Sequence, residues 1–166
     1  MRHPFAVVVN LAWAVWFGGM VMLFIALGSI FAPPVNREVA GDFAARLFPN
    51  FERLQLICAA VCLVGSAGWW LASRSRVKMV LFTLFALATL AGVVETTSIT
   101  PRIETMRVEG KRGTPEFDRM HHLSSKVYMS GAAVLLVAAL LLPGAIRSDA
   151  VSGPPVPRTS ERTAPA

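Results

Sequence analysis

The sequence predicts an all-α fold: an integral membrane four-helix bundle with an amphipathic interfacial helix between its first and second membrane spans. Two observations lead to this prediction. Four apolar runs approach or exceed the roughly 20 residues that a helix needs to cross a bilayer. In addition, 54% of the residues are hydrophobic and only 16% are charged, whereas about a quarter of a soluble domain is charged. We therefore expect one four-span domain over residues 1–146, followed by a disordered tail over residues 147–166.

The first span is expected over residues 5–32. This run carries no formal charge, and at about 1.5 Å per residue it is longer than a ~30 Å hydrocarbon layer, so it should tilt or protrude. Ala14 and Gly18 are small residues one helical turn apart, which lets a neighbouring helix approach closely. Asn10 is the only strongly polar side chain in the run, and the two prolines that follow should end the helix.

An amphipathic helix that lies on the membrane surface is expected over residues 36–48. Asn36 is a favourable N-cap, because its side chain can accept a hydrogen bond from a free backbone N–H. Apolar side chains recur every four residues along this helix at Val39, Phe43 and Leu47. Pro49 and Asn50 should end it, because proline has no backbone N–H and clashes with the preceding turn.

The second span is expected over residues 54–73, with Arg53 at its start and two tryptophans near its end as interfacial anchors. The turn over residues 74–78 is so short that the third span, residues 80–99, must run antiparallel to the second and beside it. Pro101 and Arg102 should close the third span.

The last helix should begin with Thr114 as its N-cap and Pro115 at its first position, both of which are favourable at a helix start. It then enters the fourth span, which is expected over residues 127–142 and is closed by Pro143 and Gly144.

Membrane orientation and partners follow from the basic residues. An even number of spans puts both termini and the turn over residues 74–78 on one side. That turn holds three basic residues and no acidic one, which favours cytoplasmic termini. The net charge of +6 comes largely from residues that flank apolar runs. Anionic lipid headgroups, and not nucleic acid, are therefore the expected partners. Other membrane subunits or a second copy of the chain are the remaining candidates.

The topology predicts a polar cluster at the opposite membrane face, where Arg53, Glu95, Arg102, His121 and Ser124 can meet. Glu95 is the only acid within a predicted apolar run. An ionisable residue in a span usually turns inward to a partner, and the available bases are Arg102, His121 and Lys126. The cluster would then be an ion pair or hydrogen-bonded clasp that fixes helix register. A proton or ion relay, a substrate counter-ion and a solvent-exposed carboxylate are the alternatives.

Spacings of three and four residues place further polar side chains on one face of the last helix: His121, Ser124, Ser125 and Tyr128. Such a face is typical of a membrane interface, although imidazole is also the commonest metal ligand. His122 points about 100° away from His121, so the two rings cannot easily hold one ion.

Cys58 and Cys62 share a helical face and, with His121, are the candidates for a metal site of the copper(I) type. Ordinary apolar packing is the alternative role for these cysteines, and the one that the sequence favours.

Four segments together resemble a known family: WFGGM (residues 16–20), ARLFPNFERLQ (residues 45–55), TPRI (residues 100–103) and FDRMHHLSSKVY (residues 117–128). The chain resembles, over residues 8–142, the bacterial four-helix membrane family of unknown function that is related to eukaryotic transmembrane protein 205. That resemblance implies a bacterial inner-membrane protein with four spans. The family pattern His-Gly-x-Ser with a later Asn is matched at His121 and Ser124, whereas His122 replaces the Gly and Tyr128 the Asn. The Trp-Phe-Gly-Gly run is also similar to copper-resistance membrane proteins of the CopD type.

Three functions remain compatible with these patterns. No combination of nucleophile, base and orienting group is readable, so we predict a non-enzymatic accessory or structural membrane protein without a cofactor. The alternative is a small transporter or a metal-handling protein that uses Glu95 and His121. A haem-binding electron carrier would need a second histidine among the spans, and His3 lies at the opposite membrane face.

Overall fold

The computed structural model describes residues 4–33 and 36–151. Over these ranges the chain forms helices and no strand. Four helical segments are long and apolar enough to cross a membrane: Pro4–Ile30, Glu38–Ser73, Arg76–Val108 and Pro115–Ser148. The predicted all-α, four-span membrane fold is therefore confirmed.

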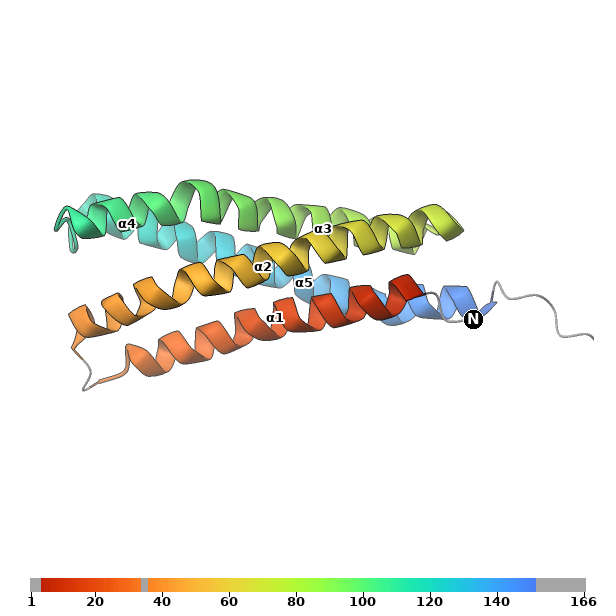
Figure 1. Ribbon diagram of the computed structural model, residues 1–166, viewed down its shortest axis with the longest axis horizontal. Helices are drawn as coiled ribbons and strands as arrows, with labels where there is room; N and C mark the ends of the chain where they lie inside the picture. Colours follow the sequence, from red (N-terminus) through yellow and green to blue (C-terminus); the bar gives the residue numbers. More distant parts are fainter. Residues whose placement is uncertain (1–3, 34–35, 152–166) are drawn as a thin grey trace, which may run out of the picture.

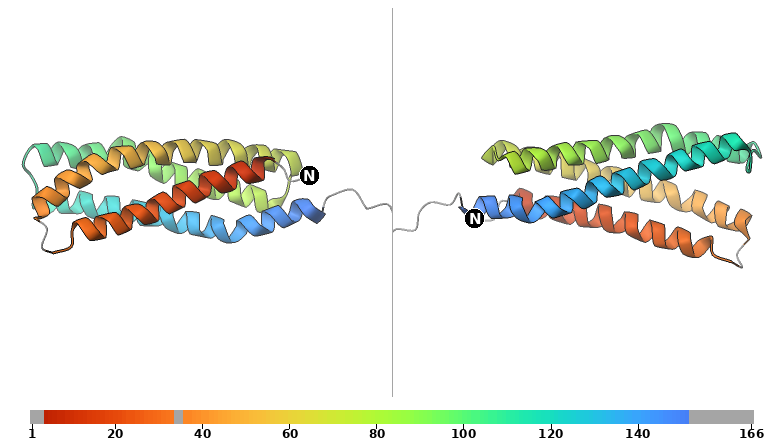
Figure 2. Two further views of the ribbon diagram at one scale, coloured as in Figure 1. Left: turned by 60° about the horizontal axis from the view of Figure 1, so that its bottom comes forward. Right: turned by 180° about the vertical axis from the view of Figure 1, so that it is seen from behind.

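The elements, in chain order, are α1 (Pro4–Ile30), α2 (Arg37–Ser73), α3 (Arg76–Val94), the π-helix η1 (Glu95–Ile99), α4 (Thr100–Val108) and α5 (Pro115–Val151). α3, η1 and α4 follow one another directly and form one long rod (Figure 1). The four rods run alternately up and down, with α1 packed mainly on α2, α2 on α3, and α3 on α5. The start of α1, the turn between α2 and α3 and the end of α5 lie at one end of the bundle, the turn end (Figure 2). The opposite end is the loop end.

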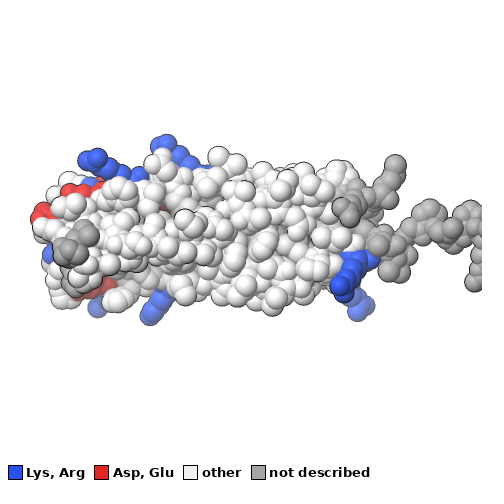
Figure 3. Space-filling view, turned by 90° about the horizontal axis from the view of Figure 1, so that it is seen from below, with Lys and Arg blue, Asp and Glu red and all other residues white. Residues whose placement is uncertain are grey.

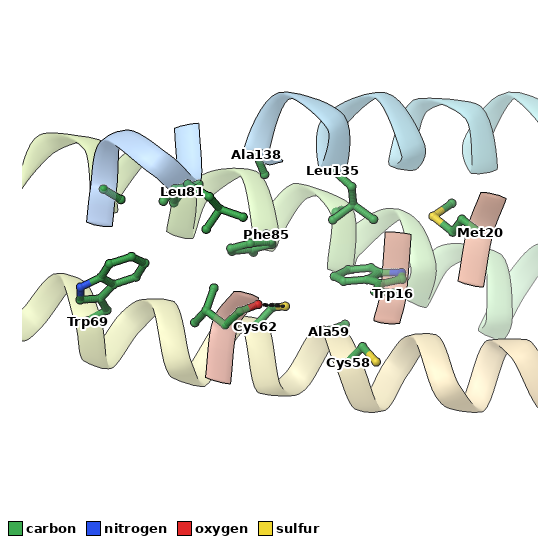
Figure 4. Packing of buried hydrophobic residues seen from close by; sticks show 14 of the residues in the cluster. Trp16, Met20, Cys58, Ala59, Cys62, Trp69, Leu81, Phe85, Leu135 and Ala138 are labelled. Atoms are coloured by element: carbon green, nitrogen blue, oxygen red, sulfur yellow. Dashed lines mark hydrogen bonds between the residues drawn. The ribbon is translucent and has the colours of Figure 1, made fainter. Parts of the chain in front are cut away.

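Buried residues recur at alternating spacings of three and four along the helices, as in a left-handed coiled coil. This core stripe contains residues 52, 55, 59, 62, 66 and 69 of α2, residues 78, 81, 85, 88, 92 and 95 of α3 and η1, and residues 124, 128, 131, 135, 138 and 142 of α5. Towards the turn end the stripe is apolar apart from Ser66 and Lys78, with Trp69, Leu81 and Phe85 fully enclosed (Figure 4). Its loop-end half contains several polar side chains, and the candidate site lies there.

The separate interfacial helix predicted for residues 36–48 is wrong, because α2 continues through Pro49 as a single helix from Arg37 to Ser73. The side-chain amide of Asn50 donates to the Arg46 carbonyl at 3.2 Å. This bond gives a backbone carbonyl next to the proline an additional hydrogen-bond partner. Ala40 and Ala44 are buried, so the core-facing side of α2 extends through the predicted break. The Asn36 cap is confirmed, since its Oδ1 accepts from the Glu38 N–H at 2.8 Å.

The third span also continues past its predicted end at Pro101. The chain widens at η1 into a π-helical turn, in which the Thr100 N–H bonds the Glu95 carbonyl five residues earlier. Pro101 then lies in the first turn of α4, where its missing N–H costs little. A local change of helix type therefore replaces the expected stop.

The fourth span likewise passes its predicted end, because α5 contains Pro143 and continues to Val151. The start of α5 is as predicted, with the Phe117 N–H bonded to Thr114 Oγ1 at 3.3 Å. Residues 147–151, assigned to a disordered tail from the sequence, belong to the helix. The remainder of that predicted tail, residues 152–166, lies outside the described residues.

The short turn between α2 and α3 is confirmed. Arg74 adopts a left-handed conformation with φ of 49°, and its N–H bonds the Trp70 carbonyl at 2.7 Å. Lys78, predicted as a turn residue, is instead 1% exposed. Its Nζ donates to Ser73 Oγ at 2.6 Å and lies 5.0 Å from the centre of the Trp69 ring. The turn end is thus closed by a lysine that the neighbouring side chains enclose.

The rods are longer than a bilayer is thick. α2 has 37 residues, or about 55 Å at 1.5 Å per residue, against a hydrocarbon layer of ~30 Å. On the face drawn in Figure 3, acidic side chains gather at one end and basic ones at both ends, with a wide band without charged side chains between them. We name the charged part at the loop end, residues 37–51, 100–108 and 115–123, the polar extension. It would project from the membrane if the uncharged band spans it.

Candidate functional site

Two glutamates lie inside the bundle, in the loop-end half of the core stripe. Glu52 comes from α2 and is 4% exposed, and Glu95 is the first residue of η1 and is 1% exposed. They interact electrostatically, so they would repel each other if both were charged. We name Glu52 and Glu95, together with Thr100, Ser124 and Tyr128, the carboxyl cluster.

Each glutamate receives hydrogen bonds from another helix. Ser124 of α5 donates its hydroxyl to Glu95 Oε1, with 2.5 Å between the oxygens. Thr100 donates to Glu52 Oε1 at 2.5 Å, and the Tyr128 hydroxyl donates to the same oxygen at 3.4 Å. The cluster therefore ties α2, the η1–α4 junction and α5 together.

The π-helical turn positions this cluster. Within η1, Glu95 and Ile99 are buried. The hydroxyl of Thr100, which follows η1, reaches α2 to bond Glu52. In the same turn, Thr96 Oγ1 is buried and has no hydrogen-bond partner among the described residues. Single π-helical turns within α-helices are frequent at functional sites, and this one begins at a buried acid.

Aromatic rings surround the Tyr128 side chain. Its ring centre lies 5.8 Å from that of Phe48 and 6.2 Å from that of Phe51, both on α2. These contacts hold the phenol in the core, where its hydroxyl faces Glu52. The arrangement positions a polar tip among apolar rings, as is usual for a buried tyrosine.

A buried glutamine lies next to the cluster, one helical turn after Glu52. Gln55 is 2% exposed, and its side chain packs against the backbone of Gly92. A Cβ at position 92 would lie only 2.5 Å from the Gln55 amide nitrogen. The glycine thus lets the Gln55 side chain pack directly against α3 at this crossing.

A small cavity lies on the side of Glu95 that faces the middle of the bundle. The space open to the centre of a water molecule is about 10 Å³, close to the smallest volume that holds one water. Its lining comes from all four rods: Trp16, Met20, Gln55, Ala88, Ala91, Gly92, Glu95, Val127, Tyr128, Gly131 and Leu135. Two of these side chains also have a buried polar atom, Glu95 Oε2 and Trp16 Nε1, without a hydrogen-bond partner in the part of the chain that the structure describes.

No base neutralises the two acids among the described residues, since neither Glu52 nor Glu95 forms an ion pair there. Taking a carboxylate out of water without a cation costs several kcal/mol or more. α3 begins at Arg76, at the turn end, and Glu95 follows it. At about 1.5 Å per residue, Glu95 lies roughly 28 Å along the rod from the turn end. A ~30 Å hydrocarbon layer that begins at the turn end would therefore reach just past Glu95. A neutral, proton-bearing carboxyl group is the form that suits such a place.

The predicted polar cluster assembles only in part. Glu95 and Ser124 are in contact, as expected, but Arg53, Arg102 and His121 are exposed. Arg102 pairs with Glu116 at 3.5 Å, and His121 stacks on Phe117 with 6.4 Å between ring centres. The expected ion pair between Glu95 and one of these bases does not form. The extra residue in the π-helical turn rotates the chain that follows, so that Arg102 points outward.

The secondary candidates have different roles. Asn10 donates to the Ala6 carbonyl of its own helix at 2.7 Å, and Ser125 donates to the His121 carbonyl at 3.0 Å. His122 is exposed. Tyr128, expected as an interface anchor, belongs to the carboxyl cluster instead.

Cys58 and Cys62 are not joined in a disulfide, and both pack in the hydrophobic core (Figure 4). The Cys62 thiol donates weakly to the Val9 carbonyl at 3.9 Å. Within residues 4–33 and 36–151, no three His, Cys, Asp or Glu side chains lie close enough to hold a metal ion. His3, the second candidate for haem ligation, lies outside the described residues.

Sequence reasoning missed Glu52, Gln55 and Thr100. The predicted second span began at residue 54, which assigned Glu52 to the interface. A signal was present, because residues 52, 55, 59, 62 and 66 follow the same alternating spacing as the apolar core positions after them. Extending that pattern backwards would have placed Glu52 and Gln55 in the core.

The polar extension and the loop over residues 109–114 contain a second group of charges, all partly or fully exposed. Asp42 of α2 accepts from Arg107 at 3.0 Å and from Arg112 at 2.6 Å. In the loop, Glu109 pairs with Lys111 at 2.7 Å and raises the pKa of that ammonium group. The two Asp42 pairs connect the start of α2 to the end of α4 and to the loop that follows it.

Comparison with curated proteins and with solved structures found no match. One family model, described as domain of unknown function (DUF4149), matches residues 11–112. The matched region includes Trp16, Glu52, Glu95 and Thr100, whereas Ser124 and Tyr128 lie beyond it. Because this region covers more than half of the chain, the protein is a member of that family of unknown function, DUF4149.

Proposed function

We propose that this protein is a non-enzymatic, accessory membrane component whose functional centre is a proton-binding site formed by Glu52 and Glu95. The observation that supports this proposal is the burial of both carboxyl groups without a cation among the described residues. Ionisable side chains inside a membrane bundle are expensive and usually functional. Two neighbouring acids can avoid mutual repulsion by binding a proton.

Proton binding would control helix packing. The protonated cluster is neutral or singly charged, and it ties α2, the η1–α4 junction and α5 by the bonds from Ser124, Thr100 and Tyr128. Loss of the proton would place a further negative charge among these helices and loosen the contact. The protein would then respond to pH on its loop side, and a partner subunit in contact with it could respond to the change in helix packing.

The test is the pH dependence of thermal unfolding in detergent micelles. Stability should be greatest at low pH, where the proton is bound in both states. It should fall as pH rises above the range in which the unfolded carboxyl groups ionise, until the folded cluster releases its own proton. Glu95→Gln is neutral at every pH, so it should abolish most of this dependence, and pH-difference infrared spectra should lose the band of a protonated carboxyl group. The matched control is Glu116→Gln, which alters an exposed acid. An unchanged pH profile and band in Glu95→Gln would refute the proposal.

As a second candidate, we propose proton or small-cation transport through the same pair. The favouring observation is the cavity beside Glu95, together with the π-helical turn at which this residue sits. In proteoliposomes that contain a pH-sensitive dye, Glu95→Gln should abolish proton flux. His121→Ala should leave it unchanged, because His121 is exposed and stacked on Phe117. Equal flux in wild type and Glu95→Gln would eliminate transport and leave the proton-responsive role.

From the resemblance to bacterial relatives of transmembrane protein 205, we propose that the protein resides in the bacterial inner membrane with cytoplasmic termini. The basic turn between α2 and α3 supports this orientation. In intact cells, a membrane-impermeant thiol reagent should label Lys111→Cys but not Arg76→Cys, since these exposed positions lie at opposite ends of the bundle. The reverse pattern would show the opposite orientation.

A further inference from the structure

The two buried glutamates have unequal hydrogen-bonding surroundings. Two hydroxyls donate to Glu52 Oε1, from Thr100 at 2.5 Å and from Tyr128 at 3.4 Å. Ser124 donates to Glu95 Oε1 at 2.5 Å. Within the described residues, Glu95 Oε2 is buried without a partner, whereas no buried oxygen of Glu52 lacks one. The two acids are therefore not interchangeable.

This difference decides where a single bound proton is most stable. Hydrogen bonds donated to a carboxyl group stabilise its charged form, and Glu52 has the larger share of them. An ionised Glu95 would leave a charged oxygen in the core without a donor, which costs more than leaving a neutral one there. A neutral Glu95 can also keep its bond to Ser124 by donating its own O–H, because a serine hydroxyl accepts as well as donates.

Other charged groups on the neighbouring elements do not override this difference. The two acids interact electrostatically with each other and with Tyr128. α1 contains no charged residue, and Lys78 of α3 is bonded to Ser73 at the turn end. The bases nearest in the chain to the cluster are exposed and form no ion pair with either acid among the described residues: Arg53, Arg102, His121 and Lys126.

Thr100 is the side chain that distinguishes the two acids. It directly follows the π-helical turn that begins at Glu95. Its hydroxyl interacts with both acids, but a hydroxyl has a single O–H, and this O–H donates to Glu52. We infer that Thr100 is a positioning residue, which keeps the negative charge on Glu52 and so makes Glu95 the acid that holds the last proton. The inference rests on the proposed function and names the residue that regulates its site.

Carbon-13 nuclear magnetic resonance of the full-length protein in micelles tests the order in which the acids ionise. With ¹³C-labelled glutamate, each side-chain carboxyl carbon reports its own protonation state, and Glu52→Gln and Glu95→Gln assign the two signals. As pH is raised, the Glu52 signal should reach the carboxylate position first and the Glu95 signal last. This order is measured in the wild type, so it does not depend on the folding of any other variant.

The role of Thr100 is tested by a change that removes its hydroxyl and keeps its shape. In Thr100→Val, the ratio of neutral Glu52 to neutral Glu95 should rise about tenfold or more, since a hydrogen bond to a charged group contributes this much. Thr100→Ser keeps the hydroxyl and should restore the wild-type order. Thr105→Val is the matched control, because this exposed threonine donates only to the Pro101 carbonyl of its own helix.

The possible results separate this inference from the proposed function. Two carboxylate signals throughout the pH range in which the protein is folded would refute proton binding, and the inference with it. A proton that is bound but leaves Glu95 first, or leaves both acids together, would overturn the inference alone. An unchanged ratio in folded Thr100→Val, or an equal change in Thr105→Val, would overturn the positioning role of Thr100.

Discussion

Ser124 of α5 donates its hydroxyl to Glu95 at the start of η1, with 2.5 Å between Ser124 Oγ and Glu95 Oε1. The two residues are 29 positions apart in the chain. Both lie on core stripes, so the bond joins the most deeply buried acid of the third rod to the fourth. Of the contacts predicted for the polar cluster, this hydrogen bond is the one that forms. It involves Glu95, one of the two acids of the proposed proton-binding site.

Removing this donor should destabilise the bundle. Ser124→Ala leaves Glu95 Oε1 without its hydrogen bond in a place closed to water, which should lower the free energy of unfolding by about 1–3 kcal/mol. Thermal unfolding in micelles measures the change. Ser125→Ala is the matched control, because this exposed neighbour bonds only its own helix, and the effect should stay within about 0.5 kcal/mol. Equal losses in the two variants would contradict the role of Ser124.

Gly92→Ala should disturb the crossing of α2 and α3. The added methyl would lie 2.5 Å from Gln55 Nε2, so the glutamine side chain must move or the helices must separate. Overpacking of this kind typically costs about 1–3 kcal/mol of stability. Gly18→Ala supplies the control, because a Cβ at position 18 meets nothing within 4 Å. Stability equal to or above that of the wild type in Gly92→Ala would show that the crossing is looser than described.

Asp42→Asn should free the connection between α4 and α5. The carboxylate accepts from both Arg107 and Arg112, at 3.0 and 2.6 Å, and an amide attracts neither guanidinium as an ion. Limited trypsin digestion should then cleave faster after Lys111 and Arg112, while the unfolding temperature changes little because the group is exposed. Glu38→Gln, on the same stretch of α2, is the control. An unchanged cleavage rate would mean that other contacts hold the loop.

Cys58 and Cys62 should resist thiol reagents in the folded protein. Their side chains are 6% and 0% exposed and lie within the hydrophobic core. A maleimide reagent should therefore label neither residue in native micelles and both after denaturation. Lys111→Cys, in the exposed loop, should react at once and so report that the reagent is active. Rapid native labelling of the two core cysteines would reveal a more open α1–α2 contact.

The membrane class and the helix count could be read from local patterns. Each apolar run is long enough to demand a spanning helix whatever surrounds it, because an unpaired backbone is too costly in lipid. The short turn after Ser73 made α2 and α3 antiparallel, and the caps at Asn36 and Thr114 are satisfied by atoms a few residues away. These features depend on neighbours in the chain, which the sequence displays directly.

Helix ends and the membership of the site depended on distant contacts. Pro49, Pro101 and Pro143 looked like stops, yet the chain passes each one inside a helix or through a π-helical turn. Tertiary packing of the continuing core stripe outweighs the local cost of a proline. Glu52 looked interfacial until Thr100 and Tyr128, 48 and 76 positions away, supplied its partners. Arg102 and His121 lie on the outer surface.

The local apolar runs thus predicted that four helices cross a bilayer. Which acids lie between those helices was decided by their rotation and packing, because burial is a property of all the rods together.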